Sequence, residues 1–166
     1  MYYIGVDPGK TGGIAILSSV SGVHGVLGVT PMIIAGSELD LSAITDWVYS
    51  YVLENNAICY IEKVSAMPKQ GVTSMFNFGF STGAIHGIIA SMEIPRYLVT
   101  PTQWKRKVLT ETNWKKNKKA SVDYCRRAYP HVPLTATERS RVAHLGMADA
   151  LCIATYGFIT EERHEL

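Results

Sequence analysis

The sequence is poor in the features that mark several large classes of protein. It has only 3 cysteines in 166 residues, widely spaced at Cys59, Cys125 and Cys152, with no Cys-x-x-Cys pair and no cysteine–histidine cluster. A disulfide scaffold and a zinc site are therefore not expected, and we interpret the cysteines as reduced packing residues of a cytoplasmic protein. The first residues, MYYIGVDPGK, lack the basic stretch and apolar run of a secretory leader, so secretion is not expected either.

One segment has some of the features of a membrane-spanning helix. Between Val72 and Met92, Gly79, Gly83 and Gly87 recur every four residues, as they do in close-packed membrane helices. Polar residues interrupt this segment, and its flanks lack the usual aromatic and basic anchors. We therefore predict a buried helix of a soluble protein, whose glycines allow a close approach either to a sheet or to the same helix of a second subunit.

Net charge is small, but its distribution along the chain is uneven. The total of +2 comes from 16 Lys and Arg against 14 Asp and Glu, and the 47% hydrophobic content predicts one globular domain over residues 1–166. From Arg96 to Arg141 there are twelve basic and three acidic residues, so this segment carries +9 and the remainder −7. Such a division favours a polyanion bound on one side and metal-binding carboxylates on the other, although a solvated lysine-rich helix face gives the same count.

The spacing of apolar residues predicts an α/β domain with a mixed five-stranded sheet. The first three apolar runs are separated by glycine-rich turns, which predicts an antiparallel meander. The fourth run lacks polar alternation, which is typical of a central strand covered on both faces. The expected strands are 2–6, 14–17, 23–29, 58–61 and 95–99, and the expected helices are about 41–52, 72–92, 101–104, 118–128 and 146–159.

Three acidic residues stand where acids are energetically costly. Asp7 ends the first strand, Glu62 ends the central strand, and Asp149 lies in an otherwise apolar helix. If the two strands are neighbours, Asp7 and Glu62 lie side by side, and a helix across that end adds Asp149. Carboxylate oxygens favour Mg²⁺ or Mn²⁺, and two such ions would activate a water and stabilise the leaving oxygen of a phosphodiester. Taken singly, each acid is equally well explained as a turn residue, an exposed strand end or a surface residue.

The order of the motifs resembles that of the RuvC-type Holliday junction resolvases. The matching stretches are IGVDPG (4–9), IEKV (61–64), VTPTQWK (99–105) and GMADAL (146–151), and MPKQGVTSMF (67–76) with FG (78–79) is most similar to the phage-encoded branch. The resemblance implies an RNase H-like fold, a homodimer, and metal-dependent nicking of branched DNA. It also implies that Asp7, Glu62 and Asp149 are metal ligands, and a phage protein of this kind would act in the cytoplasm of its host.

The chain departs from this family at two positions. Many relatives carry an acidic residue four positions before the last acid, and here that position is Leu145. His144 beside it is a candidate ligand or proton-transfer group, or else a simple helix cap. Ser65 replaces an aromatic residue that stacks on junction bases in cellular bacterial resolvases, which leaves Met67 or Phe76 as the candidate wedge.

Lysines account for the expected contacts to DNA phosphates. We predict that Lys69, Lys105, Lys118 and Lys119 neutralise phosphates, each adding roughly one unit to the salt dependence of binding. Trp104 and Trp114 stand among these basic residues, and their spacing suits core anchors as well as a DNA-facing role.

Three functions from different classes fit these observations. The favoured one is a metal-dependent endonuclease that nicks Holliday junctions. A broader version of this hypothesis adds other branched DNA, namely forks and flaps, to its substrates. It would act as a homodimer, because two symmetric cuts require two active sites related by a two-fold axis, and it would need no membrane and no nucleotide cofactor. The second is a junction-binding protein without catalysis, which Leu145 makes plausible. The third is a phosphotransferase of the actin and sugar-kinase type, because residues 5–13 also resemble the phosphate hairpin of those enzymes, which however need two such domains.

Overall fold

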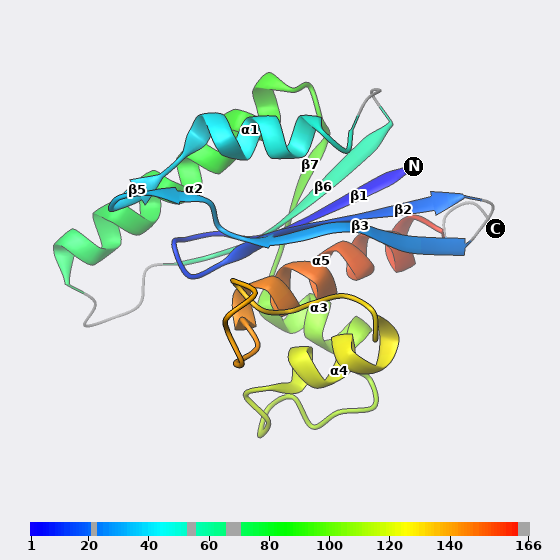
Figure 1. Ribbon diagram of the computed structural model, residues 1–166. Coiled ribbons are helices and arrows are strands. Elements are labelled where there is room, and N and C mark those ends of the chain that lie inside the picture. Colours follow the sequence, from blue (N-terminus) through cyan, green and yellow to red (C-terminus); the bar gives the residue numbers. More distant parts are fainter. Residues whose placement is uncertain (21–22, 53–55, 66–70, 163–166) are drawn as a thin grey trace.

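The computed structural model describes residues 1–20, 23–52, 56–65 and 71–162, and its centre is a five-stranded mixed sheet (Figure 1). β1 to β3 form an antiparallel meander, whereas β6 runs parallel to both β1 and β7. This arrangement confirms the predicted α/β class and mixed sheet. The strand order is β3-β2-β1-β6-β7, with bounds β1 Tyr2–Asp7, β2 Gly13–Val20, β3 Val23–Pro31, β6 Ala57–Glu62 and β7 Arg96–Val99.

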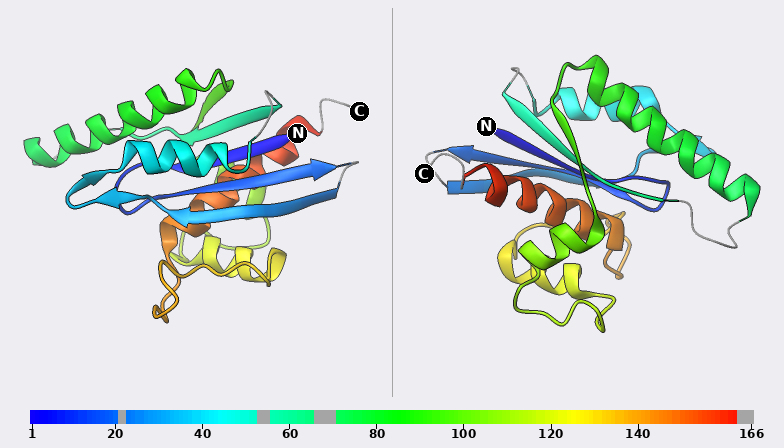
Figure 2. Two further views of the ribbon diagram at one scale, coloured as in Figure 1. Left: turned by 45° about the horizontal axis from the view of Figure 1, so that its top comes forward. Right: turned by 180° about the vertical axis from the view of Figure 1, so that it is seen from behind.

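Helices cover both faces of this sheet. Figures 1 and 2 show two helices on one face, α1 (Leu41–Tyr49) and α2 (Val72–Ser91). The other face carries α3 (Pro101–Val108), α4 (Ala120–Ala128) and α5 (Leu145–Glu161). β6 therefore has apolar neighbours on both sides, which explains why its sequence lacks polar alternation.

Alternation along the strands divides the interior into two cores. In β1, Tyr3 belongs to the core against α5, whereas Ile4 belongs to the core against α1 and α2. In β6, Tyr60 belongs to the α5 core. Because every second side chain of a strand shares a face, the strand ends Asp7 and Glu62 both point to the α5 side of the sheet.

Two glycines allow α5 to lie close to the sheet. A Cβ on Gly5 would be 2.1 Å from the carbonyl oxygen of Ala150, and a Cβ on Gly146 would be 2.3 Å from that of Thr11. A side chain at either position would require the helix, the strand or the loop to move. α5 is therefore held firmly against β1 and against the loop over residues 8–12.

α2 differs from the buried helix that the sequence predicts. Ile85 and Ile89 pack in the core, but a Cβ built on Gly79, Gly83 or Gly87 would meet no described atom within 4 Å. The glycines face away from the sheet, so of the two contacts that the sequence leaves open, the one with the sheet is wrong and the one with a second subunit stays a prediction. Among the helices that the structure describes, none is long and apolar enough to cross a membrane.

Two further differences from the sequence expectation concern local structure. A small hairpin of β4 (Ile34–Ala35) and β5 (Glu38–Leu39) turns at Gly36, whose φ of 60° favours glycine, and it was not predicted. α1 ends at Tyr49, before the predicted end at residue 52. The Ser50 hydroxyl donates a hydrogen bond of 2.7 Å to the Trp47 carbonyl oxygen, and such local bonds compete with helix continuation.

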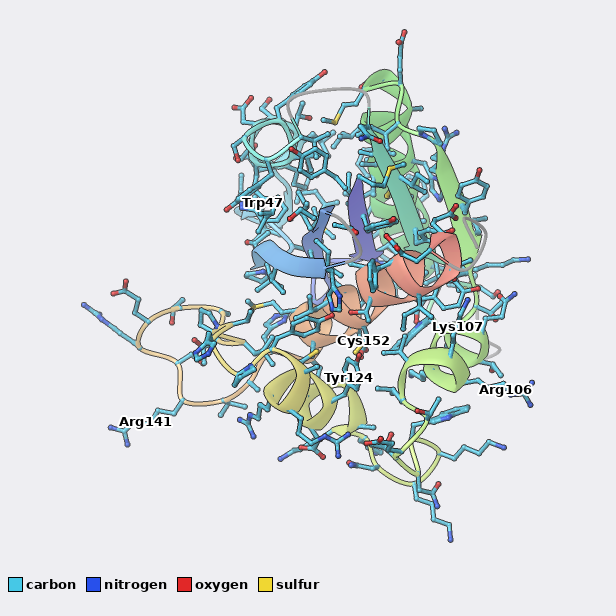
Figure 3. All side chains as sticks on the ribbon, turned by 90° about the vertical axis from the view of Figure 1, so that its right-hand side faces the viewer. Trp47, Arg106, Lys107, Tyr124, Arg141 and Cys152 are labelled. Carbon is cyan, nitrogen blue, oxygen red and sulfur yellow. The ribbon has the colours of Figure 1, made fainter. Side chains whose placement is uncertain are left out.

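The cysteines are free and buried, in agreement with their interpretation as packing residues. The sulfur atoms of Cys125 and Cys152 lie 3.7 Å apart where α4 packs against α5, and Figure 3 shows Cys152 inside the helical layer.

Candidate functional site

The carboxyl ends of β1 and β6 meet at one edge of the sheet. The two strands are parallel neighbours with Val6 opposite Ile61, so the next residues, Asp7 and Glu62, lie side by side. Both side chains point to the face covered by α5, and Asp149 comes from that helix. The structure therefore brings together the three acids that the sequence singles out, and we call them the carboxylate cluster.

Electrostatic repulsion couples these three groups. Burial raises the pKa of Asp7 to about 8, and the charges of Glu62 and Asp149 add to the rise. Burial is also the main cause that raises the pKa of Glu62, and the charge of Asp149 contributes. Burial likewise raises the pKa of Asp149, against a side-chain hydrogen bond with Ser121 of α4. Because close negative charges in a poorly hydrated place are costly, the cluster favours a proton or a cation.

α3 positions an aromatic residue against the cluster. A capping box between Thr100 and Gln103 begins this helix immediately after β7, with Pro101 in its first turn. In the following turn Trp104, which is fully buried, donates a hydrogen bond of 2.8 Å from Nε1 to Oε1 of Glu62. This bond lowers the pKa of Glu62 and so opposes part of the effect of burial.

Lys105 supplies a positive charge to the same place. Its Nζ lies 5.0 Å from the centroid of the Trp104 ring. Burial raises the pKa of Asp7, Glu62 and Asp149, and the charge of Lys105 lowers all three. Lys105 was predicted only as a phosphate contact, and the structure places it within electrostatic reach of the whole carboxylate cluster.

His144 is the cap of α5. Its Nδ1 accepts a hydrogen bond of 3.2 Å from the backbone N–H of Met147. This matches the helix-cap alternative that the sequence leaves open, and Nε2 is the atom left for the predicted proton transfer. Leu145 is the first residue of the helix and is 47% exposed, so it offers no ligand to the site.

The chemistry of the cluster suits a hard divalent cation, although its three side chains do not converge on one point. All three side chains end in carboxylate oxygens, the ligand atoms that Mg²⁺ and Mn²⁺ prefer, and a cation would relieve their mutual repulsion. Within the described part of the chain, no three His, Cys, Asp or Glu side chains form a ready-made metal-binding group. The fit therefore rests on charge and donor chemistry, and the side chains have to turn toward a shared ion.

Basic side chains surround the helical layer on the α5 side of the sheet. Lys118 and Lys119 are exposed just before α4 begins. Figure 3 shows Arg106 and Arg141 extending away from the body of the protein on opposite sides of this layer. The uneven charge in the sequence thus becomes a basic surface that lies on the same side of the sheet as the carboxylate cluster.

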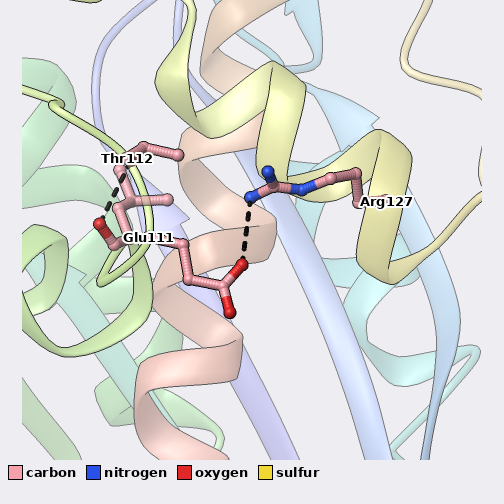
Figure 4. A network of polar contacts seen from close by, with 4 residues as sticks. Glu111, Thr112 and Arg127 are labelled. Carbon is pink, nitrogen blue, oxygen red and sulfur yellow. Dashed lines mark hydrogen bonds and ion pairs between the residues drawn. The ribbon is translucent and has the colours of Figure 1, made fainter.

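Among the described residues, one ion pair joins an acid to this basic segment. Between residues that the structure describes, the only ion pair joins Arg127 to Glu111 at 3.9 Å (Figure 4). Both side chains are largely exposed, and an exposed pair contributes little to stability. The basic surface therefore keeps the character that binding to a polyanion requires.

The remaining predicted DNA contacts fall in two groups. Phe76 is 72% exposed on α2, so it is accessible to a ligand. Met67 and Lys69 lie outside the described residues. The sequence left Trp104 and Trp114 open between a core role and a DNA-facing role. Trp104 is a buried residue of the hydrophobic core on the α5 side of the sheet, and Trp114 packs against that core, partly buried.

Sequence reasoning missed the two polar partners of the cluster. Neither the hydrogen bond from Trp104 to Glu62 nor the one between Ser121 and Asp149 was predicted. The sequence did contain a signal for the first bond. Trp104 and Lys105 stand next to each other in a helix with a clear capping box, so an indole N–H donor and a positive charge were available close to a carboxylate. Ser121 carried no signal, since only tertiary packing brings α4 to this part of α5.

The fold matches solved structures of Holliday junction resolvases. Against Thermus thermophilus RuvC in complex with a Holliday junction substrate, the TM-score is 0.68 at 20% identity, covering 98% of this chain and 96% of that chain. Against a further Thermus thermophilus RuvC structure, it is 0.67 at 20% identity, covering 98% and 97%. Against the yeast mitochondrial Holliday junction resolvase, it is 0.62 at 12% identity, covering 97% and 80%. No family model and no curated protein matches the sequence.

These likenesses show the RuvC-type, RNase H-like fold that the sequence predicts. The three named structures come from a bacterium and from yeast mitochondria, so they do not support the predicted place on the phage-encoded branch.

Proposed function

We propose that this protein is a metal-dependent endonuclease that nicks four-way DNA junctions. The observation that carries the proposal is the carboxylate cluster, in which Asp7, Glu62 and Asp149 raise the cost of one another's charge beside a basic surface. The fold adds support, because Thermus thermophilus RuvC has the same fold and its structure contains a Holliday junction substrate. We include forks and flaps as further proposed substrates of the same site.

The proposed cofactor is Mg²⁺, with Mn²⁺ as a substitute, held by the carboxylate cluster. Two divalent ions in such a site would make an attacking water more acidic and stabilise the leaving oxygen of the phosphodiester. A phosphodiester is itself an anion, so a site made only of carboxylates would repel it without added positive charge.

The residues of this chain divide the remaining work. Trp104 holds one oxygen of Glu62 and leaves the other oxygen for a ligand. Lys105 offers its charge to the phosphate that approaches the cluster, while Lys118 and Lys119 bind phosphates further along the DNA. His144, fixed through Nδ1, presents Nε2 as a group that takes up or releases a proton.

A second copy of the chain is the proposed partner of the open face of α2. Val72, Phe76 and Phe80 are 80%, 72% and 60% exposed, and they follow one another at intervals of four residues along this helix. The glycines on the open face would allow a close approach of a second helix, and a two-fold dimer would place two sites on one junction. Sedimentation velocity tests this, with Gly83→Arg expected to give a monomer, and a dimer that survives the substitution would argue against this face.

The decisive test of catalysis uses a labelled four-way junction with Mg²⁺ or Mn²⁺. Asp7→Asn and Glu62→Gln should each slow cleavage by about 100-fold or more, while binding in EDTA is retained. Asp46→Asn, on the exposed side of α1, is the matched control and should cleave normally. Retained cleavage in both cluster variants would contradict the proposal.

Two further outcomes separate the alternatives. A junction that the wild-type protein binds but leaves intact under both metals would favour a DNA-binding module without catalysis. If junction, fork, flap and linear duplex are compared, symmetric nicks confined to the four-way junction indicate a dedicated resolvase. Similar cutting of every branched form indicates a debranching nuclease.

A further inference from the structure

The turn of α5 that carries Asp149 packs against α4 through contacts of two thiols. The Cys125 thiol donates to the Ala148 carbonyl oxygen at 3.5 Å, and its sulfur lies 3.7 Å from that of Cys152. The Cys152 thiol in turn donates to the Ser121 carbonyl oxygen at 4.0 Å. Because these contacts lie before and after Asp149 along α5, they fix how the two helices face each other at this acid.

Ser121 lies inside this contact, in the first turn of α4. It is only 5% exposed, and its hydroxyl donates a hydrogen bond to the carboxylate of Asp149. A carboxylate has two oxygens and can accept several bonds, so a donor on one oxygen leaves the other for a cation. The hydroxyl can therefore hold Asp149 without removing it from the carboxylate cluster.

Repulsion between the acids makes such a hold necessary. The close contact with Gly5 fixes the backbone of α5, but the Asp149 side chain can still rotate about its own bonds. Burial raises the pKa of Asp7 and of Glu62, and the charge of Asp149 adds to both rises. The same repulsion drives the Asp149 carboxylate away from the other two when no cation lies between them. The bond from Ser121 restrains a side chain that would otherwise take other orientations.

The start of α4 is itself fixed by Asn117. Its side-chain oxygen accepts a hydrogen bond of 2.9 Å from the backbone N–H of Lys119, and its Nδ2 donates to Oδ2 of Asp123 at 2.9 Å. Asn117 thereby joins Lys119 to the turn that carries Ser121. A lysine proposed to bind phosphate and the hydroxyl that holds Asp149 therefore belong to one hydrogen-bonded unit.

We propose that Ser121 is a positioning residue for metal binding, through which α4 orients the Asp149 carboxylate toward a divalent cation. The inference rests on the proposed function and adds to it a requirement for α4. Trp104 of α3 holds Glu62 in a comparable way, so two of the three acids depend on helices of the basic segment 96–141. That segment therefore has a second task besides contacting phosphates, because it orients the groups that bind the metal.

A purely structural role of Ser121 is the alternative. A small buried side chain lets two helices approach closely, and alanine would serve that purpose equally well. Such a role predicts at most a loss of stability in Ser121→Ala, with metal affinity unchanged. Partners of metal ligands behave differently, because their removal lowers metal affinity by about 10- to 100-fold.

The first test needs neither DNA nor cleavage. Free Mn²⁺ is measured by electron paramagnetic resonance as the ion is added to the full-length protein. Ser121→Ala should weaken Mn²⁺ binding by about 10-fold. In an Asp149→Ala background the same substitution should change the affinity by less than about two-fold, because the acceptor of its bond is gone.

Thr155→Val is the matched control for both tests. It removes another buried hydroxyl, 2% exposed, which bonds to the Tyr129 hydroxyl at 2.8 Å where α5 meets the end of α4. It lies away from the carboxylate cluster, so it should bind Mn²⁺ as tightly as the wild-type protein. The midpoint of urea unfolding in EDTA is measured for both variants, which separates a loss of stability from a loss of metal affinity.

The second test follows single-turnover cleavage of a labelled four-way junction over a range of Mn²⁺ concentrations. Ser121→Ala should need about 10-fold more Mn²⁺ for its half-maximal rate, and excess Mn²⁺ should restore most of that rate. Its affinity for the junction in EDTA should equal that of the wild-type protein. This test also decides the question if the cation binds only together with DNA.

The outcomes separate this inference from the function on which it rests. If the wild-type protein cleaves junctions and Ser121→Ala keeps the wild-type dependence on Mn²⁺, the positioning role is wrong and the proposed function stands. Equal losses of Mn²⁺ affinity in Ser121→Ala and Thr155→Val would also overturn the inference, because any loosening of α4 would then have the same effect. If the wild-type protein neither binds Mn²⁺ nor cleaves, both are wrong.

Discussion

The buried indole of Trp104 donates a hydrogen bond of 2.8 Å to Oε1 of Glu62. This bond connects α3 to the end of β6 and favours the ionised carboxylate, because a donor stabilises negative charge. Trp104 is therefore a positioning residue for the carboxylate cluster, although its sequence context allowed a plain core role.

Trp104→Phe should alter the pH dependence of cleavage. Without the indole donor, burial raises the pKa of Glu62 unopposed by this bond, so the acid limb of the pH profile should move to higher pH. Cleavage should also fall by about 10- to 100-fold, as it does when partners of ligating residues are lost, while binding in EDTA persists. Trp47→Phe on α1 is the control. An unshifted profile in Trp104→Phe would show that the indole only fills space.

Asp7→Asn should stabilise the metal-free protein near pH 8. The pKa of Asp7 is about 8 in the folded protein and about 3.9 in an unfolded chain. The folded protein therefore binds the proton more tightly, and the contribution of this proton to the free energy of unfolding is at its full size below about pH 4. That contribution is lost as the pH rises through 8, and a neutral amide avoids the loss. The melting temperature in EDTA should rise by about 2–4 °C for each kcal/mol recovered at pH 8, with no gain near pH 4. An equal gain at both pH values would contradict this origin.

Lysine substitutions should divide into two patterns. Lys118→Ala and Lys119→Ala should each reduce the slope of log affinity against log salt by roughly one unit, because each removes one phosphate contact. Lys105→Ala should slow cleavage far more than it weakens binding, because its charge acts on the whole carboxylate cluster. Gel shifts at several salt concentrations, combined with single-turnover cleavage, measure both effects. Identical patterns for all three lysines would mean that Lys105 is only a phosphate contact.

Two glycine substitutions should have opposite effects on stability. Gly5→Ala forces a Cβ to 2.1 Å from the Ala150 carbonyl oxygen, so it should lower the free energy of unfolding by about 3 kcal/mol or more. Gly83→Ala meets no described atom and lies within a helix, so it should be neutral or stabilise by up to about 1 kcal/mol. Urea unfolding at low protein concentration, where the proposed dimer would be dissociated, measures both. Similar losses in the two variants would contradict the packing described for α5.

The thiols should resist labelling in the native protein. Burial raises the pKa of Cys59 and of Cys152, and all three cysteines are buried. Because the thiolate is the reactive form, a disulfide reagent at pH 8 should react slowly with the native protein and rapidly with all three thiols in denaturant. Fast reaction of Cys125 or Cys152 in the native protein would show that α4 opens away from α5.

The clustering of the acids was predictable because two simple periodicities determine it. Parallel neighbouring strands align their carboxyl ends, and alternation then sends Asp7 and Glu62 to one face. The exposed side of α2 was not predictable, because that helix is apolar around most of its circumference and its hydropathy does not distinguish the covered side from the open one.

The close contact of α5 with β1 has a consequence for when the carboxylate cluster is complete. During synthesis, Asp7 and Glu62 leave the ribosome well before Asp149. Until the last helix docks through Gly5 and Gly146, a nascent chain has two acids and no complete cluster. The proposed activity would therefore depend on completion of the fold, because the last helix to be synthesised brings the third acid of the cluster.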